Sequence, residues 1–337
     1  MKLELTAVLN NVKPIALTLL SSLSVIKCGY CMQFNWFSMS YKNIGVTLSV
    51  LGLVACSQTP VVIQEGSLEA VLKQVYDCSA SITLRSQALE RAQVTQACAM
   101  LAEQEALFHR TFNTLGQPVA NDNNDNMRAN IYADREAYVQ YVTDHFDVPS
   151  DNGGMYLEGL PHLADNHAEF VAYERNGEIW NLRHEYIHYL DGRFNMYGDF
   201  CASLHDSHSA PEYCPQPAPL LPHLVWWSEG VAEYIAHQQH NPRAIKNGAK
   251  QDYKLSELFN TSYEQNGGSE RVYDWGYLAV RFMMEQHREQ VDVMLSLTRR
   301  GFYSRYQALV KQWGTQYDAE FATWLTERAT ELDAENG

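Results

Sequence analysis

The spacing of apolar residues along the chain gives the first indication of its structure. From Ser67 to Thr114 apolar side chains recur at intervals of three and four, as on one face of a helix. A polar break near Ser79–Thr83 interrupts this pattern. The segment therefore predicts two helices that pack as a hairpin, within a region expected to cover residues 57–120.

The middle of the chain has shorter apolar runs, rich in β-branched and aromatic residues. Such runs predict strands, here at Met127–Tyr132, Gly154–Glu158 and Glu169–Tyr173, while Glu136–Phe146 has helical spacing. The last strand is followed by Arg175-Asn176-Gly177, which is typical of a turn, here expected before the next helix. The polar run Asn121–Asn126 predicts a loop, because it lacks the glycine and terminal glutamate of a calcium-binding loop.

The last third of the chain is predicted to be helical, at Leu255–Phe259, Val272–His287, Val291–Arg299, Tyr303–Trp313 and Glu320–Leu332. Strands followed by helices indicate the α+β class. We expect one main domain over residues 121–337. Its upper part covers about 121–195, and its lower, helical part covers about 220–337.

The N-terminus has the features of an export signal. Residues Met39–Asn43 form a short charged start, Ile44–Ala55 are apolar, and Leu53-Val54-Ala55-Cys56 has the form of a bacterial lipobox. We therefore expect residues 1–56 to be an upstream extension plus a lipoprotein signal, with a lipid on Cys56. The alternatives are an ordinary signal peptide and a short membrane anchor. This predicts an exported, outer-membrane-anchored lipoprotein, periplasmic or at the cell surface, with an extracellular location as the other possibility.

The cysteines predict covalent cross-links, and the net charge limits the binding partners of the chain. Four cysteines follow the lipobox, and an even number in an exported chain predicts two disulfides, Cys78–Cys98 and Cys201–Cys214. A cysteine-based zinc site is the alternative, and a redox or metal site at Cys28 and Cys31 is the sharper but less favoured hypothesis for that pair. The net charge of −15 argues against a nucleic-acid partner. We expect a monomer.

The stretch His184-Glu185-Tyr186-Ile187-His188 carries the strongest chemical signal. Residues four apart share a face of a helix, so His184 and His188 can bind one Zn²⁺. Glu185 follows the first histidine, where its carboxylate can act as general base. A chance occurrence is the alternative for the motif alone, so the third ligand is decisive.

A zinc peptidase needs a third protein ligand and an open position. The metzincin pattern would require glycine at position 191 and histidine at 194, where this chain has Asp191 and Phe194. Downstream, Glu229 and Glu233 lie four apart after two tryptophans. We assign Glu229 as the third ligand and Glu233 as the carboxylate that orients a ligand histidine. The alternative is an amphipathic helix with two solvated glutamates.

These motifs resemble those of the microbial collagenases, zinc peptidases of the gluzincin clan, over about Asp151 to Glu285. The resemblance implies a thermolysin-like fold with a small mixed sheet, an antiparallel edge strand and a helical lower subdomain. It implies zinc on His184, His188 and Glu229, with Glu185 as base. It also implies that the double-glycine stretch lines the substrate cleft, through Gly153, Gly154, Met155 and Tyr156.

Further roles follow partly from the same resemblance. Glu158 is expected to help to hold a structural Ca²⁺. A peptidase of this type needs a donor for the oxyanion, and Tyr273 is the first candidate and Tyr277 the second, with packing as the alternative for both. Among the other histidines, a surface location is favoured.

Two departures from the family limit the prediction of substrate. Glu229 follows His188 by 41 residues, a long separation that we ascribe to the proline-rich run between Cys201 and Pro222. If the mature chain begins at Cys56, only 97 residues precede Gly153, so the large helical activator domain is not expected. The sequence thus predicts a zinc endopeptidase acting on collagen-like, gelatin or envelope polypeptides. The alternative is a catalytically silent, lipid-anchored module that binds peptide or matrix.

Overall fold

The computed structural model describes residues 27–28, 31–32, 64–151, 153–198, 224–263 and 268–336. The chain divides into two units, Met1–Val62 and Ile63–Gly337. In the first unit, β1 (Lys27–Cys28) and β2 (Cys31–Met32) form an antiparallel pair. The lipobox at Cys56, Asn152 and the Cys201–Cys214 pair lie outside the described residues. No helix in the described part has the length and apolar character needed to cross a membrane.

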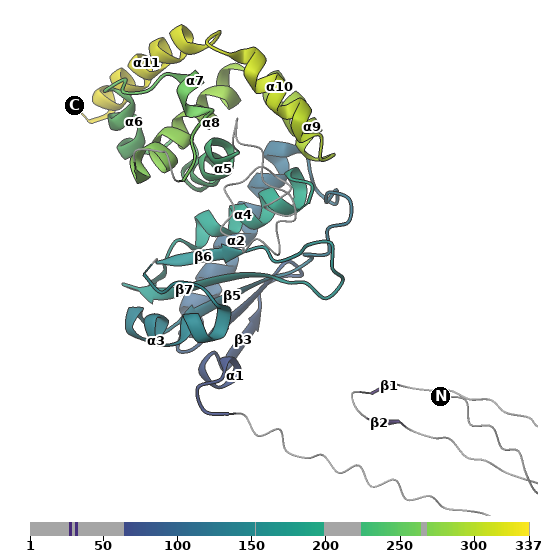
Figure 1. The fold of residues 1–337 in the computed structure, drawn as a ribbon. Helices are drawn as coiled ribbons and strands as arrows, with labels where there is room; N and C mark the ends of the chain where they lie inside the picture. Colours follow the sequence, from purple (N-terminus) through teal and green to yellow (C-terminus); the bar gives the residue numbers. More distant parts are fainter. Residues whose placement is uncertain are drawn as a thin grey trace, which may run out of the picture. The chain divides into compact units, whose positions relative to one another are not determined.

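The second unit contains a mixed six-stranded sheet, which Figure 1 shows below a group of helices. The strand order is β3-β4-β5-β7-β6, with β8 paired to β7. The contacts β4–β5 and β5–β7 are parallel, whereas β3–β4, β6–β7 and β7–β8 are antiparallel. The strands are β3 (Gln74–Asp77), β4 (Ile82–Ser86), β5 (Met127–Tyr132), β6 (Gly154–Leu157), β7 (Ala168–Arg175) and β8 (Glu178–Ile179).

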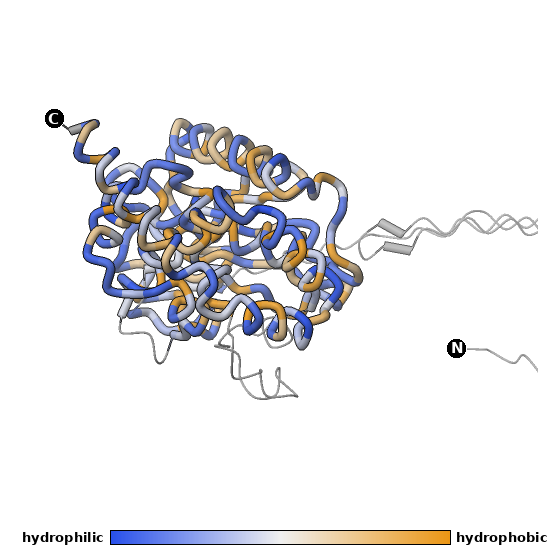
Figure 2. The backbone as a smooth tube through the Cα atoms, turned by 90° about the horizontal axis from the view of Figure 1, so that it is seen from above, coloured by the Kyte–Doolittle hydropathy of each residue, from blue (hydrophilic) through white to orange (hydrophobic). Residues whose placement is uncertain are grey.

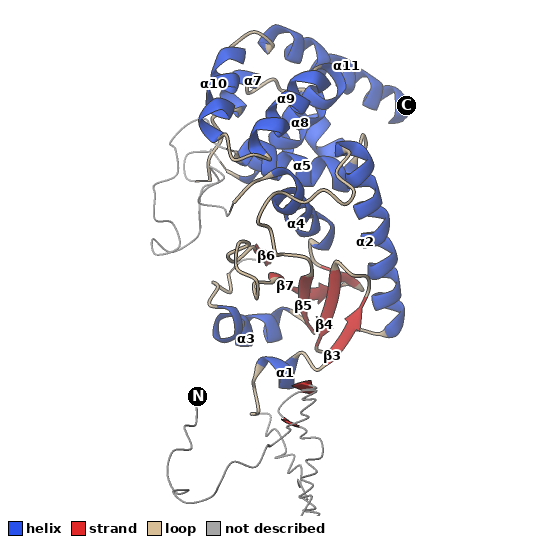
Figure 3. Cartoon of the chain, turned by 90° about the vertical axis from the view of Figure 1, so that its right-hand side faces the viewer, coloured by secondary structure: helices blue, strands red, loops and turns tan. Residues whose placement is uncertain are grey.

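The two faces of the sheet are covered by different helices, as Figure 3 shows from the side. Successive side chains of a strand point to opposite faces, so β7 can serve two cores. Phe170 and Ala172 belong to the larger core with α2 (Arg91–Phe112) and α4 (Leu182–Asn195). Val171 and Tyr173 belong to a smaller core with α1 (Leu68–Val71) and α3 (Arg135–Phe146).

The predicted helical hairpin over Ser67–Thr114 is wrong in its first half. Apart from the single turn α1, this half forms the antiparallel strands β3 and β4, and only α2 is a long helix. Apolar residues that fit a helical period also fit the strand alternation that β4 shows, and pairing with β5 favours the strand. The predicted disulfide Cys78–Cys98 is confirmed, and it ties the end of β3 to α2 across a Cα–Cα distance of 5.1 Å.

The remaining predicted elements are confirmed with small changes at their ends. β5 has the predicted bounds, and the Asn176-Gly177 pair forms the turn between β7 and β8 with positive φ at both residues. The helices of the last third are α5 (Val225–His237), α6 (Pro242–Gly248), α7 (Leu255–Leu258), the π-helical turn η1 (Glu270–Asp274), α8 (Trp275–Gln286), α9 (Arg288–Thr298), α10 (Tyr303–Trp313) and α11 (Asp318–Asn336). The α+β class is therefore confirmed.

Figure 2 shows hydrophobic and hydrophilic residues alternating along these helices, as expected where each helix buries one face. Helices α5 and α8 approach each other closely at a pair of glycines. A Cβ atom on Gly230 would stand 2.4 Å from the backbone oxygen of Gly276, a distance that real atoms do not reach. The glycine pair thus lets the two backbones touch, which fixes the position of α5.

Candidate metal centre

Helix α4 presents two histidines one turn apart. Its first turn follows Asn181, a residue with positive φ whose backbone oxygen accepts hydrogen bonds from the amides of His184 and Glu185. The Nε2 atoms of His184 and His188 are 3.0 Å apart, and their rings are nearly perpendicular. The helix alone therefore brings the two nitrogen atoms close enough to bind the same metal ion.

Helix α5 brings a carboxylate to the same point. Glu229 Oε2 lies 3.0 Å from His184 Nε2 and 3.5 Å from His188 Nε2. Ligands about 2.0–2.1 Å from a tetrahedral Zn²⁺ would be separated by about 3.3 Å, so these spacings fit such an ion. Two imidazole nitrogens and one carboxylate oxygen are also the donor set that zinc prefers.

The buried carboxylates of this site favour the binding of a cation. Burial alone would raise the pKa of Glu229, but the charge and hydrogen bonds of His188 and His184 hold it well below its ordinary value. Burial would lower the pKa of His184, but its hydrogen bonds to Glu229 and Glu233 raise it well above its usual range. The site therefore contains carboxylates that are ionised at neutral pH and stabilised by positive charge.

Glu233 supports His184 from the side opposite Glu229. Its Oε1 atom lies 2.9 Å from His184 Nδ1, and His237 Nε2 lies 3.4 Å from its Oε2 atom. These hydrogen bonds outweigh burial and lower the pKa of Glu233 to about 2. A carboxylate in this position fixes both the tautomer and the orientation of the ring.

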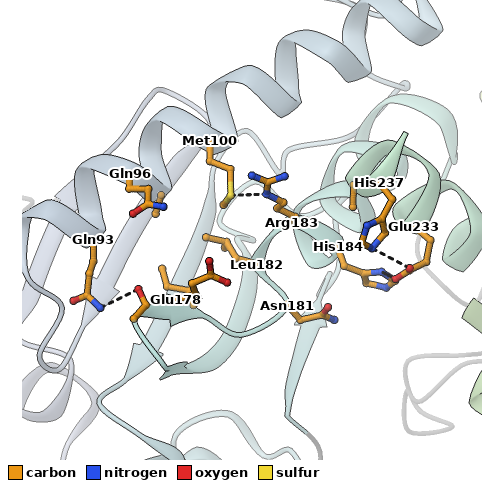
Figure 4. A pocket seen from close by; sticks show the side chains of 14 residues that line it. Gln93, Gln96, Met100, Glu178, Asn181, Leu182, Arg183, His184, Glu233 and His237 are labelled. Carbon is orange, nitrogen blue, oxygen red and sulfur yellow. Dashed lines mark hydrogen bonds and ion pairs between the residues drawn. The ribbon is translucent and has the colours of Figure 1, made fainter. Parts of the chain in front are cut away.

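A cavity of about 320 Å³ is lined in part by Glu233 and His237. Figure 4 shows His184, Glu233 and His237 along one of its walls, and Gln93, Gln96 and Met100 of α2 along another. His237 is about half exposed there.

The remaining residue of the motif, Glu185, is buried beside the histidines. Its Oε1 atom accepts a hydrogen bond of 2.8 Å from the side-chain amide of Asn181. The carboxylate that sequence analysis assigns as base is therefore held in one orientation.

Comparison with known proteins places this chain in a family. Residues 56–324 match the family model described as Collagenase. The chain belongs to this collagenase family. A microbial collagenase of Vibrio alginolyticus is 38% identical over 314 residues, which are 89% of this chain and 36% of that protein. A microbial collagenase of Vibrio parahaemolyticus is 44% identical over 259 residues, 76% of this chain and 30% of that protein.

More distant relatives include collagenase ColT of Clostridium tetani, 24% identical over 224 residues, 62% of this chain and 20% of that protein. The family resemblance predicted from the sequence is confirmed. The chain spans about a third of the length of the Vibrio relatives that it matches.

Three tyrosines of this collagenase-family chain differ in their positions relative to the metal centre. The Tyr273 ring lies 5.7 Å from the His184 ring, so the first oxyanion candidate is at the centre. The Tyr277 hydroxyl donates to the backbone oxygen of Gln238, 2.8 Å away, so the second candidate is engaged elsewhere. Tyr263 was not predicted, yet its hydroxyl donates to Glu229 Oε1.

A buried carboxylate joins the two ligand-bearing helices. The indole nitrogen of Trp227 on α5 donates to Asp191 Oδ2 of α4 at 3.1 Å, and Asn195 donates to Asp191 Oδ1 at 2.7 Å. Burial, only partly offset by these hydrogen bonds, raises the pKa of Asp191 to about 6. Sequence analysis named Asp191 only as a departure from the metzincin pattern, so its contact with Trp227 was not predicted.

The double-glycine stretch forms the edge strand β6. A Cβ atom on Gly153 would stand 2.3 Å from the indole nitrogen of Trp180, so a larger residue would require the indole ring to move. Gly154 starts the strand, Met155 packs toward the smaller core, and the Tyr156 ring lies 6.2 Å from His188. The strand thus lies next to the metal centre, and its role in substrate binding stays a prediction.

Glu158 is buried beside α4. A Cβ atom on Gly192 would stand 2.7 Å from its Oε1 atom. Its backbone oxygen accepts hydrogen bonds from the side chains of Asn124 and Asn166, at 3.2 and 2.9 Å. Asn124 belongs to the polar run that was predicted to be a loop, and it lies in one.

Proposed function

We propose that the chain is a zinc-dependent metalloendopeptidase with a thermolysin-like arrangement. The observation that carries this proposal is the convergence of His184, His188 and Glu229, with Glu185 beside them, in a chain of the collagenase family. When bound, zinc supplies a Lewis acid that polarises the scissile carbonyl and makes water a nucleophile near neutral pH.

The chain's own residues supply the proton chemistry. Glu185, oriented by Asn181, accepts a proton from the attacking water and delivers it to the leaving amine. Tyr273 donates a hydrogen bond to the oxyanion; burial and the charge of Glu229 raise its pKa, so it keeps its proton. Glu233 holds His184 in the orientation and tautomer that a ligand requires.

The edge strand provides a binding mode for an extended peptide. Among the strands that the structure describes, β6 pairs only with β7, so its other edge can pair with a substrate backbone by β-augmentation. Gly153 and Gly154 bring this edge close to neighbouring groups. The substrates that we propose are gelatin, collagen-like and other extracellular or envelope polypeptides. The silent binding module is not favoured, because the base and all three ligands are present.

Several finer assignments accompany the proposal. We propose that Glu158 helps to hold a Ca²⁺ ion, and that Asn124 and Asn166 order the backbone beside it through their hydrogen bonds to its backbone oxygen. We also propose an exported monomer, held at the outer membrane by a lipid on Cys56.

The test compares cleavage of gelatin and of native triple-helical collagen by the purified chain with stoichiometric Zn²⁺. A Glu185→Gln variant and a chelated sample serve as controls. We expect gelatin to be cut, with loss of cleavage in both controls. Cleavage that survives in the Glu185→Gln variant would contradict the assignment of the base. Cutting of triple-helical collagen in the same assay would extend the substrate range to the intact fibre-forming protein.

A further inference from the structure

The two oxygens of the Glu229 carboxylate are in different environments. Oε2 faces the Nε2 atoms of His184 and His188 at 3.0 and 3.5 Å. Oε1 accepts a hydrogen bond from the Tyr263 hydroxyl. A free carboxylate can bind a metal through one oxygen or through both, and here one oxygen is already committed to a protein donor.

The hydroxyl of Tyr263 is the donor in this contact, because an ionised carboxylate oxygen can only accept a hydrogen bond. The residue is only partly exposed, and it follows Thr261 and Ser262, which are buried.

The chain before Tyr263 is anchored to its neighbours. The amide of Thr261 donates to the backbone oxygen of Leu258 in α7 at 2.9 Å. Its hydroxyl accepts a hydrogen bond of 3.2 Å from Arg271 of η1. Arg271 donates in turn to the backbone oxygen of Glu257. The tyrosine is thus attached to a braced segment.

We propose that Tyr263 is a positioning residue that holds Glu229 as a one-oxygen metal ligand. This inference rests on the proposed zinc site. A carboxylate that turned both oxygens to the ion would occupy two coordination positions, and one of these is needed for water and substrate. The hydrogen bond from Tyr263 opposes that rotation, so it keeps the open position available. No spacing in the sequence marks this residue.

The chain offers matched controls, because three tyrosines can each lose one hydroxyl. Tyr263→Phe removes the contact with Glu229, Tyr273→Phe removes the proposed oxyanion donor, and Tyr277→Phe removes a hydroxyl bonded to Gln238. Each variant of the full chain is titrated with Zn²⁺ against a chromophoric chelator, and is also loaded with Co²⁺ for its visible absorption spectrum.

We expect Tyr263→Phe to lower zinc affinity about 10-fold, the lower end of the range for loss of a group that orients a ligand. Its cobalt absorption should weaken, because a second carboxylate oxygen raises the coordination number. Tyr273→Phe should keep the affinity and spectrum but lose about 10²-fold in kcat. Tyr277→Phe should change neither.

An unchanged cobalt spectrum in Tyr263→Phe would overturn the inference, whatever its zinc affinity. A failure of the proposed function looks different. In that case the wild-type chain itself would bind zinc no better than a His184→Ala variant.

Discussion

The two helices that supply the metal ligands are held in place in different ways. In α4, the separation of His184 and His188 is set by helix geometry within a single turn. In α5, the position of Glu229 depends on a close crossing with α8 at Gly230 and on the bond from Trp227 to Asp191. The histidine pair is therefore a local property of the sequence, whereas the complete centre is a property of packing. Changes at the crossing of α5 and α8 should therefore damage the centre, although they do not touch a ligand.

The largest expected effect comes from removing the contribution of α5. Glu229→Ala leaves the two histidines as the only protein ligands, so zinc affinity should fall on the order of 10³-fold, and cleavage with it. Zinc titration of the variant measures this. Glu289→Ala, an exchange of an exposed helical glutamate on α9, is the control and should bind zinc normally. Retained wild-type affinity in Glu229→Ala would separate α5 from the metal site.

Removing the base should affect turnover alone. Glu185→Gln keeps the side chain's shape but cannot accept the proton, so kcat should fall about 10²–10⁴-fold. Zinc affinity should stay near the wild-type value, because Glu185 is not a ligand. The measurements are peptide hydrolysis and zinc titration on one preparation. Equal losses in both would mean that Glu185 acts by holding the metal.

A change at the helix crossing tests whether packing positions Glu229. In Gly230→Ala the added methyl group meets the backbone of Gly276 at 2.4 Å, so α5 must shift. We expect a loss of about 1–3 kcal/mol in unfolding free energy, together with weaker zinc binding. Gly276→Ala is the matched control, because its nearest contact is 3.3 Å away and should cost less. Denaturant unfolding and zinc titration measure both variants. A larger loss in Gly276→Ala than in Gly230→Ala would contradict this prediction.

A pH dependence of stability is expected at Asp191, where the two helices meet. The pKa of this carboxyl is about 6 in the folded chain and 3.8 as its ordinary value, so folding favours its protonated form. The stabilisation is present below pH 3.8 and is lost as pH rises through 6.

Relative to Asp191→Asn, the zinc-free wild-type chain should therefore lose on the order of 2 kcal/mol of unfolding free energy between pH 4 and pH 7. Denaturant unfolding of both chains across this range measures the difference. A constant difference between them would show that Asp191 does not titrate there.

The sequence predicts the parts of the structure that depend on neighbouring residues. The strand Met127–Tyr132, the Asn176-Gly177 turn and the ligand pair on α4 all follow from local patterns, and the structure has them. The segment that forms β3 and β4 was mispredicted, because its pairing with β5 depends on residues more than 40 positions away.

Contacts made only by packing could not be predicted. Tyr263 lies 34 residues from Glu229, and Trp227 lies 36 residues from Asp191. Both pairs of residues lie too far apart in the sequence for a helical or strand repeat to predict their contact. Asn181 is a partial exception, since a residue just before a helix commonly bonds to its first turn, although here it reaches the side chain of Glu185.

The most direct test of the account is anomalous diffraction at the zinc absorption edge from crystals of the zinc-loaded chain. We predict one strong peak per chain, within bonding distance of His184 Nε2, His188 Nε2 and Glu229 Oε2, which would show α4 and α5 joined by one ion. A peak bound by the two histidines alone, with Glu229 turned away, would contradict the claim that packing of α5 completes the centre.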